Sequence, residues 1–228
     1  PNHRLITERV HAEGGKILLQ VVHTGRNAKV PLPVGPSSLA SRINPCEIHI
    51  LSSDEIEQII DAFAYSAKLA KEAGYDGVEI MGSEGYLINQ MLATRTNDRT
   101  DEWGGDYENR MRFALEIVRR VKEAVGENFI IMYRISAIDL VEEGSTGAEI
   151  LQLAKALEEA GVTLFNTGIG WHEARVPTIA YMVPRAAWRF AIRELTASVT
   201  IPVIASNRIN TPDVANDIVA SGDADMVS

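Results

Sequence analysis

Short apolar runs and longer amphipathic segments alternate along the chain. The runs have the length of strands, and the segments between them carry apolar residues at helical spacing. The expected strands are 15–23, 75–81, 128–136, 162–170, 201–207 and 224–228. The expected helices are 3–15, 52–74, 109–126, 145–161, 184–197 and the segment that begins after Thr211-Pro212. The pattern therefore predicts an α/β fold.

Capping residues support two of these helices. Ser52 and Glu55 have the spacing of a capping box at the start of one helix, and Thr146 and Glu149 have it at the start of another. Both helices end in the phrase Glu-Ala-Gly, directly before an expected strand. This helix-ending sequence recurs because the same strand–helix unit is repeated.

The expected strands are apolar on both faces and are separated by helices, which is typical of a parallel sheet. A doubly wound open sheet is the rival, but no strand is followed by a G-x-G-x-x-G fingerprint. A (β/α)8 TIM barrel has eight strands, and six are found here. We expect residues 1–228 to form one partial barrel domain, about strands 3 to 8, and to belong to a longer polypeptide.

Composition excludes several classes of function. The net charge is −9 and no basic cluster is present, so nothing indicates a nucleic-acid partner. The apolar runs are too short to span a bilayer, so no membrane segment is expected. The single cysteine, Cys46, cannot form an internal disulfide, which fits a reducing compartment and predicts a cytoplasmic protein. No cysteine–histidine spacing indicates a metal site.

Polar side chains gather where the expected strands end, which is where barrels of this kind place their function. They are Gln20, His23 to Arg26, Glu84, Tyr86, Asn89, Gln90, Arg95, Tyr133, Arg134, Thr167, Trp171, His172, Asn207 and Arg208. Taken singly, most have a structural explanation: Tyr86 as a packing residue and His172 as a surface residue. Arg134 is different, because a guanidinium among apolar neighbours needs a partner. Five strand ends in a row favour a functional site.

This set of side chains suits flavin mononucleotide (FMN). An amide such as Gln20 can both donate and accept at the pyrimidine edge of the ring. A fixed cation such as Arg134 near that edge stabilises the anionic reduced ring. Arg208 is the candidate for the phosphate, because barrels commonly bind phosphate beside their last two strand–helix loops.

Three segments resemble the Old Yellow Enzyme family of flavin barrels. They are "LQVVHTGR", "GYDGVEIMGSEGYLINQMLATRTNDRTDEWGGDYENRMRF" and "NTGIGWHEARVPT". The resemblance covers essentially the whole chain and implies an FMN-binding TIM barrel. Many members carry His-x-x-His or His-x-x-Asn to hold a substrate carbonyl, where this chain has Met81 and Glu84. Simple enone reduction is therefore not expected.

Within that family, the Met-Gly-Ser-Glu-Gly-Tyr and Trp-His-Glu-Ala-Arg forms look like those of bacterial NADPH-dependent 2,4-dienoyl-CoA reductases. The resemblance implies hydride transfer from FMN to a conjugated acyl-CoA thioester, with NADPH as the ultimate donor. It assigns protonation to Tyr86 and His172 with help from Glu84, FMN contacts to Gln20, Arg134 and Arg208, and substrate contacts to Arg95, Trp171 and Arg175. Full-length members also carry FAD and a 4Fe–4S cluster, whose sites this chain lacks.

Other functions remain open at this point. An enoate or enone reductase, or an amine dehydrogenase of the same superfamily, would keep the flavin and change the substrate. A metal-dependent or Schiff-base aldolase barrel would need clustered carboxylates or a lysine at a strand end, and the strand ends have neither. A catalytically inactive fragment that serves as a binding module is the last alternative, and it would lack the flavin absorption spectrum.

Overall fold

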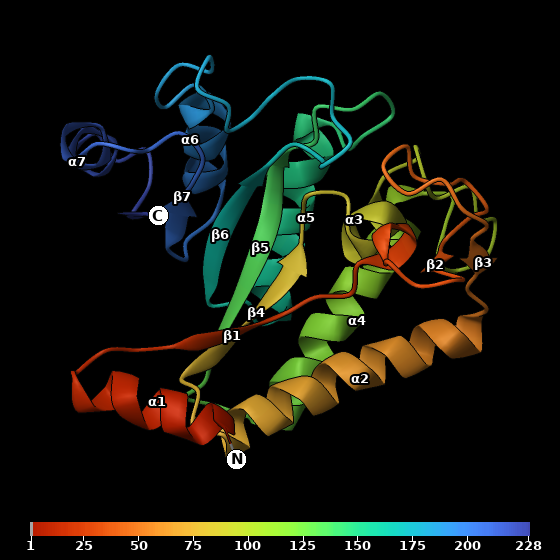
Figure 1. Ribbon diagram of the computed structural model, residues 1–228, viewed down its shortest axis with the longest axis horizontal. Coiled ribbons are helices and arrows are strands. Elements are labelled where there is room, and N and C mark those ends of the chain that lie inside the picture. Colours follow the sequence, from red (N-terminus) through yellow and green to blue (C-terminus); the bar gives the residue numbers. More distant parts are fainter. Residues whose placement is uncertain (1) are drawn as a thin grey trace.

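The computed structural model describes residues 2–228, and its centre is a six-stranded parallel sheet (Figure 1). The strands, in sheet order, are β1 (Leu18–Val21), β4 (Gly77–Gly82), β5 (Ile130–Ile138), β6 (Leu164–Ile169), β7 (Val203–Ala205) and β8 (Met226–Val227). Two short parallel strands, β2 (Val34–Gly35) and β3 (His49–Ile50), form a second sheet in the loop after β1. The predicted α/β fold with a parallel sheet is confirmed. The order follows the chain without the reversal of a doubly wound sheet.

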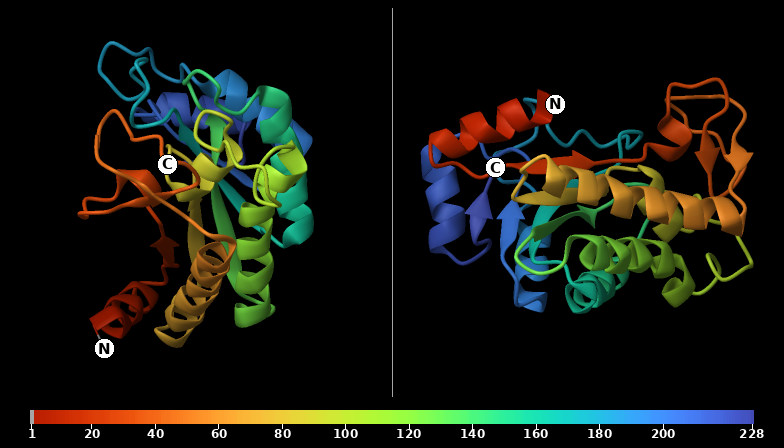
Figure 2. Two further views of the ribbon diagram at one scale, coloured as in Figure 1. Left: turned by 90° about the vertical axis from the view of Figure 1, so that its right-hand side faces the viewer. Right: turned by 90° about the horizontal axis from the view of Figure 1, so that it is seen from below.

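The helices are α1 (Asn2–Ala12), α2 (Ser53–Glu72), α3 (Leu87–Leu92), α4 (Tyr107–Val125), α5 (Gly147–Ala160), α6 (Arg189–Ser198) and α7 (Pro212–Ala220), with a 3-10 turn at Gly25–Asn27. Helices α2, α4 and α5 lie next to one another and cover one face of the sheet (Figure 2). The core lies between them and the strands, around fully buried residues such as Ile80, Tyr133 and Phe165. Among residues 2–228, no helix has both the length and the apolar character needed to cross a bilayer.

The structure confirms both predicted capping boxes: Ser52 with Glu55, and Thr146 with Glu149. Sequence and structure differ at α6, which begins at Arg189 rather than near Pro184. The preceding residues form turns, with Ala186 in a left-handed conformation. Helix α3 and the 3-10 turn were not predicted, because elements this short leave no periodic pattern.

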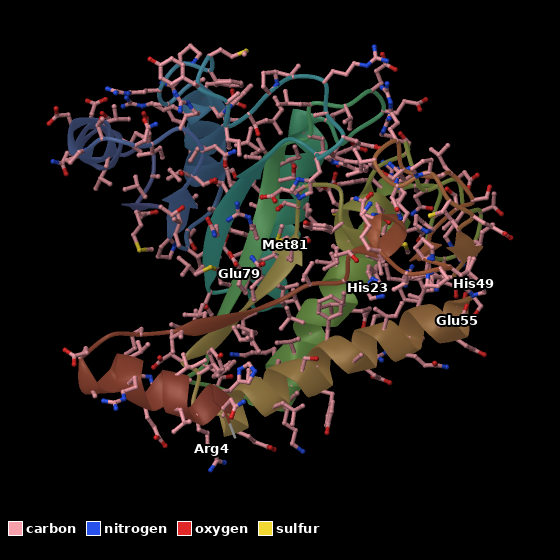
Figure 3. All side chains as sticks on the ribbon, in the orientation of Figure 1. Arg4, His23, His49, Glu55, Glu79 and Met81 are labelled. Carbon is pink, nitrogen blue, oxygen red and sulfur yellow. The ribbon has the colours of Figure 1, made fainter. Side chains whose placement is uncertain are left out.

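The other face of the sheet carries polar side chains. Gln20 is level with Glu79 on the neighbouring strand, and Arg134 is level with Asn166. Glu79 and Met81 project from the middle of the sheet in Figure 3. Parallel sheets usually bury apolar side chains on both faces, so a polar face with half-exposed residues marks the side on which a ligand would bind.

At the opposite end of the sheet, side chains cap the starts of strands. Each capping residue directly precedes one strand and accepts a backbone N–H at the start of the strand before it in the sheet. The pairs are Asp76 with Ile17 N (2.9 Å), Thr163 with Ile131 N (3.0 Å) and Asp225 with Val203 N (2.8 Å). Because one slipped residue would turn every side chain to the other face, these caps fix the register that places the site residues.

Candidate active site

The loop after β4 makes a tight left-handed turn, here called the Tyr86 turn (residues 84–86). Glu84 has φ +63° and Gly85 has φ +80°. A side chain at Gly85 would also collide with the ring of Trp171, 2.8 Å from the position of its Cβ. Glycine is therefore required at position 85, and the strained conformation of Glu84 turns its carboxylate toward β5. Strain of this kind persists only where the surroundings hold it.

Amide side chains hold the Tyr86 turn from two directions. Gly85 donates its N–H to Asn89 Oδ1 (3.0 Å), and its carbonyl accepts from Asn27 Nδ2 (3.0 Å) and Gln90 Nε2 (2.7 Å). Asn89 also donates to the buried carboxylate of Asp139 (3.3 Å). The first turn of α3 and the loop after β1 thus fix the backbone that carries Tyr86.

Tyr86 and His172 meet although 86 residues separate them in the sequence. His172 Nε2 lies 2.9 Å from the Tyr86 hydroxyl, and the two rings pack edge to face. The same nitrogen is 3.6 Å from Glu84 Oε2. Burial raises the pKa of the Tyr86 phenol, and the negative charge of Glu84 raises it further. The phenol therefore holds its proton firmly, and it could release the proton readily only if a neighbouring group stabilised the phenolate.

Arg134 is paired with Glu84. Its Nε and Nη2 lie 3.0 Å and 2.9 Å from Glu84 Oε1. The sequence predicted that this guanidinium would need a partner, and the Tyr86 turn supplies it. These two residues line a cavity of about 250 Å³ together with Trp171, His172 and Asn207. Glu84 therefore holds the guanidinium of Arg134 in place and offsets its charge.

The other two residues expected at FMN have protein partners. Gln20 donates its amide N–H to Glu79 Oε2 (2.6 Å) at the middle of the sheet face. Arg208 donates from Nε to the carbonyl of Val183 (2.8 Å) and from Nη2 to that of Tyr181 (3.3 Å). Arg208 thus holds the loop before α6, and its contact with a phosphate stays a prediction.

Two of the three residues expected at the substrate, Arg95 and Arg175, lie beside Glu173. Arg95 donates to its carboxylate at 3.0 Å, and the buried Arg26 lies 2.5 Å from it. Burial works to raise the pKa of Glu173, but the charge of Arg26 and the hydrogen bonds of Arg95 and of the Arg42 backbone lower it overall. Arg42, Arg95 and Arg175 line a second cavity, of about 220 Å³, beside Glu173. Trp171 is buried against Gly85 and shapes the Tyr86 turn.

Three residues that the sequence analysis did not place in the site contribute to it: Glu79, Asn166 and Glu173, the last as the partner of Arg26. Attention to strand ends missed Glu79 and Asn166, which lie inside strands. A charged residue between Val78 and Ile80 was the available signal. For Glu173 and Arg26, 147 residues apart, no local pattern indicates the pairing.

A further cavity, of about 450 Å³, lies between β1 and α2. Its walls are mainly apolar, with Val21, Val34, Leu51, Ile59 and Phe63 among them. It lacks the converging ionisable groups of the strand ends, so the smaller cavity lined by Glu84, Arg134 and His172 is the stronger candidate for the chemistry. Residues 2–228 contain no group of three or more His, Cys, Asp or Glu side chains that could hold a metal ion.

Comparison with known proteins matches residues 1–228 to the family described as "NADH:flavin oxidoreductase / NADH oxidase family". The chain belongs to this family. A metal reductase of Desulforamulus reducens is 42% identical over all of this chain, and an NADH oxidase of Thermoanaerobacter brockii is 41% identical over 98% of it. The chain spans about a third of the length of these curated relatives, 35% of each.

Solved structures agree with this membership of the flavin oxidoreductase family. A 2-naphthoyl-CoA reductase in complex with 2-naphthoyl-CoA superimposes with a TM-score of 0.95 at 32% identity, over 99% of this chain and 37% of that one. An Old Yellow Enzyme homologue from Zymomonas mobilis gives a TM-score of 0.80 at 26% identity, over 99% of this chain and 66% of the other. The resemblance to Old Yellow Enzyme-like FMN proteins is confirmed.

The residues of this family member fit an FMN ring. The polar sheet face offers the amide of Gln20, which is exposed, and the guanidinium of Arg134 on β5. The pyrimidine edge of a flavin carries both carbonyl acceptors and an N–H donor, so amide and guanidinium groups match it. The Oδ1 atom of Asn166 is buried on the same face without a hydrogen-bond partner, and such an atom needs water or a ligand.

Proposed function

We propose that this protein uses FMN to reduce a carbon–carbon double bond of a conjugated acyl-CoA thioester, with a 2,4-dienoyl-CoA as the substrate and NADPH as the ultimate electron donor. The observation that carries the proposal is the 2.9 Å contact between Tyr86 and His172, beside the Glu84–Arg134 ion pair at the ends of the strands. His172, Glu84 and Arg134 line one cavity, and a phenol hydrogen-bonded to this imidazole beside a paired guanidinium suits reduction followed by protonation.

The proposed FMN site uses Gln20 and Arg134 for the ring and Arg208 for the phosphate. In this proposal the six strands form an arc of a TIM barrel, which their uninterrupted order and the fit to flavoenzyme structures support. The polar face of the sheet is then the inside of the barrel. Bound FMN supplies the hydride, and every other part of the reaction falls to the residues of this chain.

Tyr86 is the proposed proton donor. Addition of a hydride to the far carbon of a conjugated thioester sends negative charge toward the thioester oxygen, and a proton must then reach carbon. When Tyr86 O–H gives up this proton, His172 can donate an N–H to the phenolate that remains. Because burial and Glu84 both raise the pKa of the phenol, this stabilisation by His172 is essential to the proposal.

The proposed substrate has anionic groups, and the chain offers cations for them. Arg42, Arg95 and Arg175 line the cavity of about 220 Å³ next to the loop that carries His172, together with Glu142 and Glu173. Glu173 is already paired with Arg95 and Arg26. Arg42 and Arg175 are exposed, so their charges are available to a ligand. The phosphates of CoA match such a pocket, since guanidinium groups bind phosphate with two parallel hydrogen bonds. The fit to a naphthoyl-CoA reductase supports the same substrate class.

The decisive experiment combines an acceptor panel with Tyr86→Phe. We expect the flavin-loaded protein, once reduced, to be reoxidised faster by a dienoyl-CoA than by a simple enone or a free enoate. Tyr86→Phe should retain FMN and lower this turnover by roughly 10²–10⁴-fold, the usual worth of a general acid. Wild-type turnover in Tyr86→Phe would remove Tyr86 from the mechanism.

The rival function is electron transfer to oxygen or to a metal ion, as in the relatives named NADH oxidase and metal reductase. Those reactions need no proton at carbon. Tyr86→Phe should therefore leave reoxidation by oxygen or ferric ion unchanged while it slows reduction of the thioester. If no thioester, enone or enoate reoxidises the protein and oxygen or ferric ion does, the rival is the correct function.

A further inference from the structure

Glu79 lies at the centre of a polar cluster that the proposed mechanism does not use. It sits in the middle of β4 on the polar face of the sheet, and its carboxylate accepts two hydrogen bonds. Gln20 Nε2 donates to Oε2 at 2.6 Å from β1, and Asn166 Nδ2 donates to Oε1 at 2.7 Å from β6. One carboxylate thus joins three strands, because Asn166 reaches it across β5.

The chemistry of these groups fixes which way both amides point. An ionised carboxylate only accepts hydrogen bonds, and an amide has a donating NH₂ side and an accepting oxygen side. Gln20 and Asn166 must therefore turn their NH₂ groups toward Glu79 and their oxygens away from it. A neutral side chain at position 79 would not impose this orientation on both amides.

We propose that Glu79 is a positioning residue for the flavin site, an inference that rests on the proposed FMN function. Asn166 holds the carboxylate from one side, and the carboxylate holds the amide of Gln20 with its oxygen outward. Gln20 is exposed on this face, so that oxygen is available to a ligand. The site then presents a fixed acceptor, which selects a ring that carries an N–H group at its edge.

The test compares FMN with an analogue methylated at the pyrimidine N–H, using flavin fluorescence to measure each dissociation constant. Wild-type protein should bind FMN more tightly than the analogue. In Glu79→Gln, one of the two amides loses its acceptor, so we expect FMN to bind about 10-fold more weakly, within the range for a hydrogen bond to a charged group. The preference for FMN over the methylated analogue should shrink by a similar factor. The exposed Glu123→Gln on α4 is the matched control and should change neither constant.

Two further variants test whether Glu79 acts through Gln20. In a Gln20→Leu background, Glu79→Gln should have no additional effect on FMN binding, because the group that it orients is gone. Glu79→Asp, which keeps an acceptor-only group, should restore part of the preference. Equal weakening of both ligands in Glu79→Gln, or unchanged binding of both, would overturn the role of Glu79. Failure of the wild-type protein to bind FMN would instead overturn the proposed function.

Discussion

The Tyr86 turn and the segment of residues 176–182 border the same cavity but are held in opposite ways. In the turn, the backbone of Gly85 is bonded to three amide side chains and covered by Trp171. In the segment, which precedes α6 (Figure 1), Ile179, Tyr181 and Met182 are 72%, 96% and 78% exposed. Its anchors are two backbone carbonyls, which accept from Trp188 and Arg208.

This difference matches different needs. In the proposed mechanism Tyr86 is a proton donor, which must stay in place, because a misplacement of one ångström is costly in catalysis. Residues 176–182 would form a wall of the substrate site, and a segment with few buried contacts opens at low cost in free energy. We therefore expect chemistry to depend on the Tyr86 turn and substrate range to depend on residues 176–182.

The largest effect is expected at Glu173, which anchors the loop that carries His172. Glu173→Gln removes the charge that compensates the buried Arg26, and leaving a buried charge unpaired costs about 3–5 kcal/mol. Urea unfolding measures the loss. The control is Glu57→Gln, whose partner Arg120 lies on the surface, where a pair contributes about 0–1 kcal/mol. Equal losses in the two variants would show that burial does not set the cost.

Gly85→Ala tests the turn directly. Alanine is strained at φ +80°, and its Cβ would press on Trp171, so we expect the free energy of unfolding to fall by about 3 kcal/mol. Gly222→Ala is the matched control, since Gly222 has φ +70° with open space around it and should lose only about 1 kcal/mol. A Gly85→Ala variant no less stable than Gly222→Ala would mean that Trp171 moves aside freely.

The pH dependence of turnover should respond to Glu84. In the proposed mechanism Tyr86 acts only while protonated, so we expect activity to be lost as the pH rises through its pKa, which burial and Glu84 both raise. Glu84→Gln removes the second cause, and the alkaline limb of the pH–rate profile should move to lower pH. The exposed Glu123→Gln is the control and should leave the alkaline limb in place. If the limb also stays in place in Glu84→Gln, the group that titrates there is not Tyr86.

The smallest effect is expected in the exposed segment. Tyr181→Ser removes a side chain with almost no contacts, so the free energy of unfolding should change by less than about 0.5 kcal/mol. We expect the variant to keep its turnover but to change the ratio of the Michaelis constants for different dienoyl-CoA substrates. A loss of stability comparable to that of Gly85→Ala would contradict the difference between this segment and the Tyr86 turn.

Much of this architecture could be predicted from the chain because its cues are local. Helical spacing, capping boxes and Glu-Ala-Gly stops identified the strand–helix alternation and hence the parallel sheet. The contact of Tyr86 with His172 was anticipated only through resemblance to a family, since no spacing rule connects residues that far apart. Glu79 was overlooked because it is a single charged residue in an apolar strand. Its role becomes visible only when the sheet places it opposite Gln20 on the neighbouring strand.

The side-chain caps at Asp76, Thr163 and Asp225 fix the strand register at the end of the sheet opposite the candidate site. Each is made within a few residues of a strand's beginning, and none involves the loops that carry Tyr86, His172 or Arg175. Substitutions in the loops at the carboxyl ends of the strands can therefore accumulate without changing the strand register, which is fixed at the opposite end of the sheet. Exchanging residues 176–182, which leaves Trp171 and Glu173 in place, for those of a relative with different substrates should thus yield folded chimaeras with altered preference.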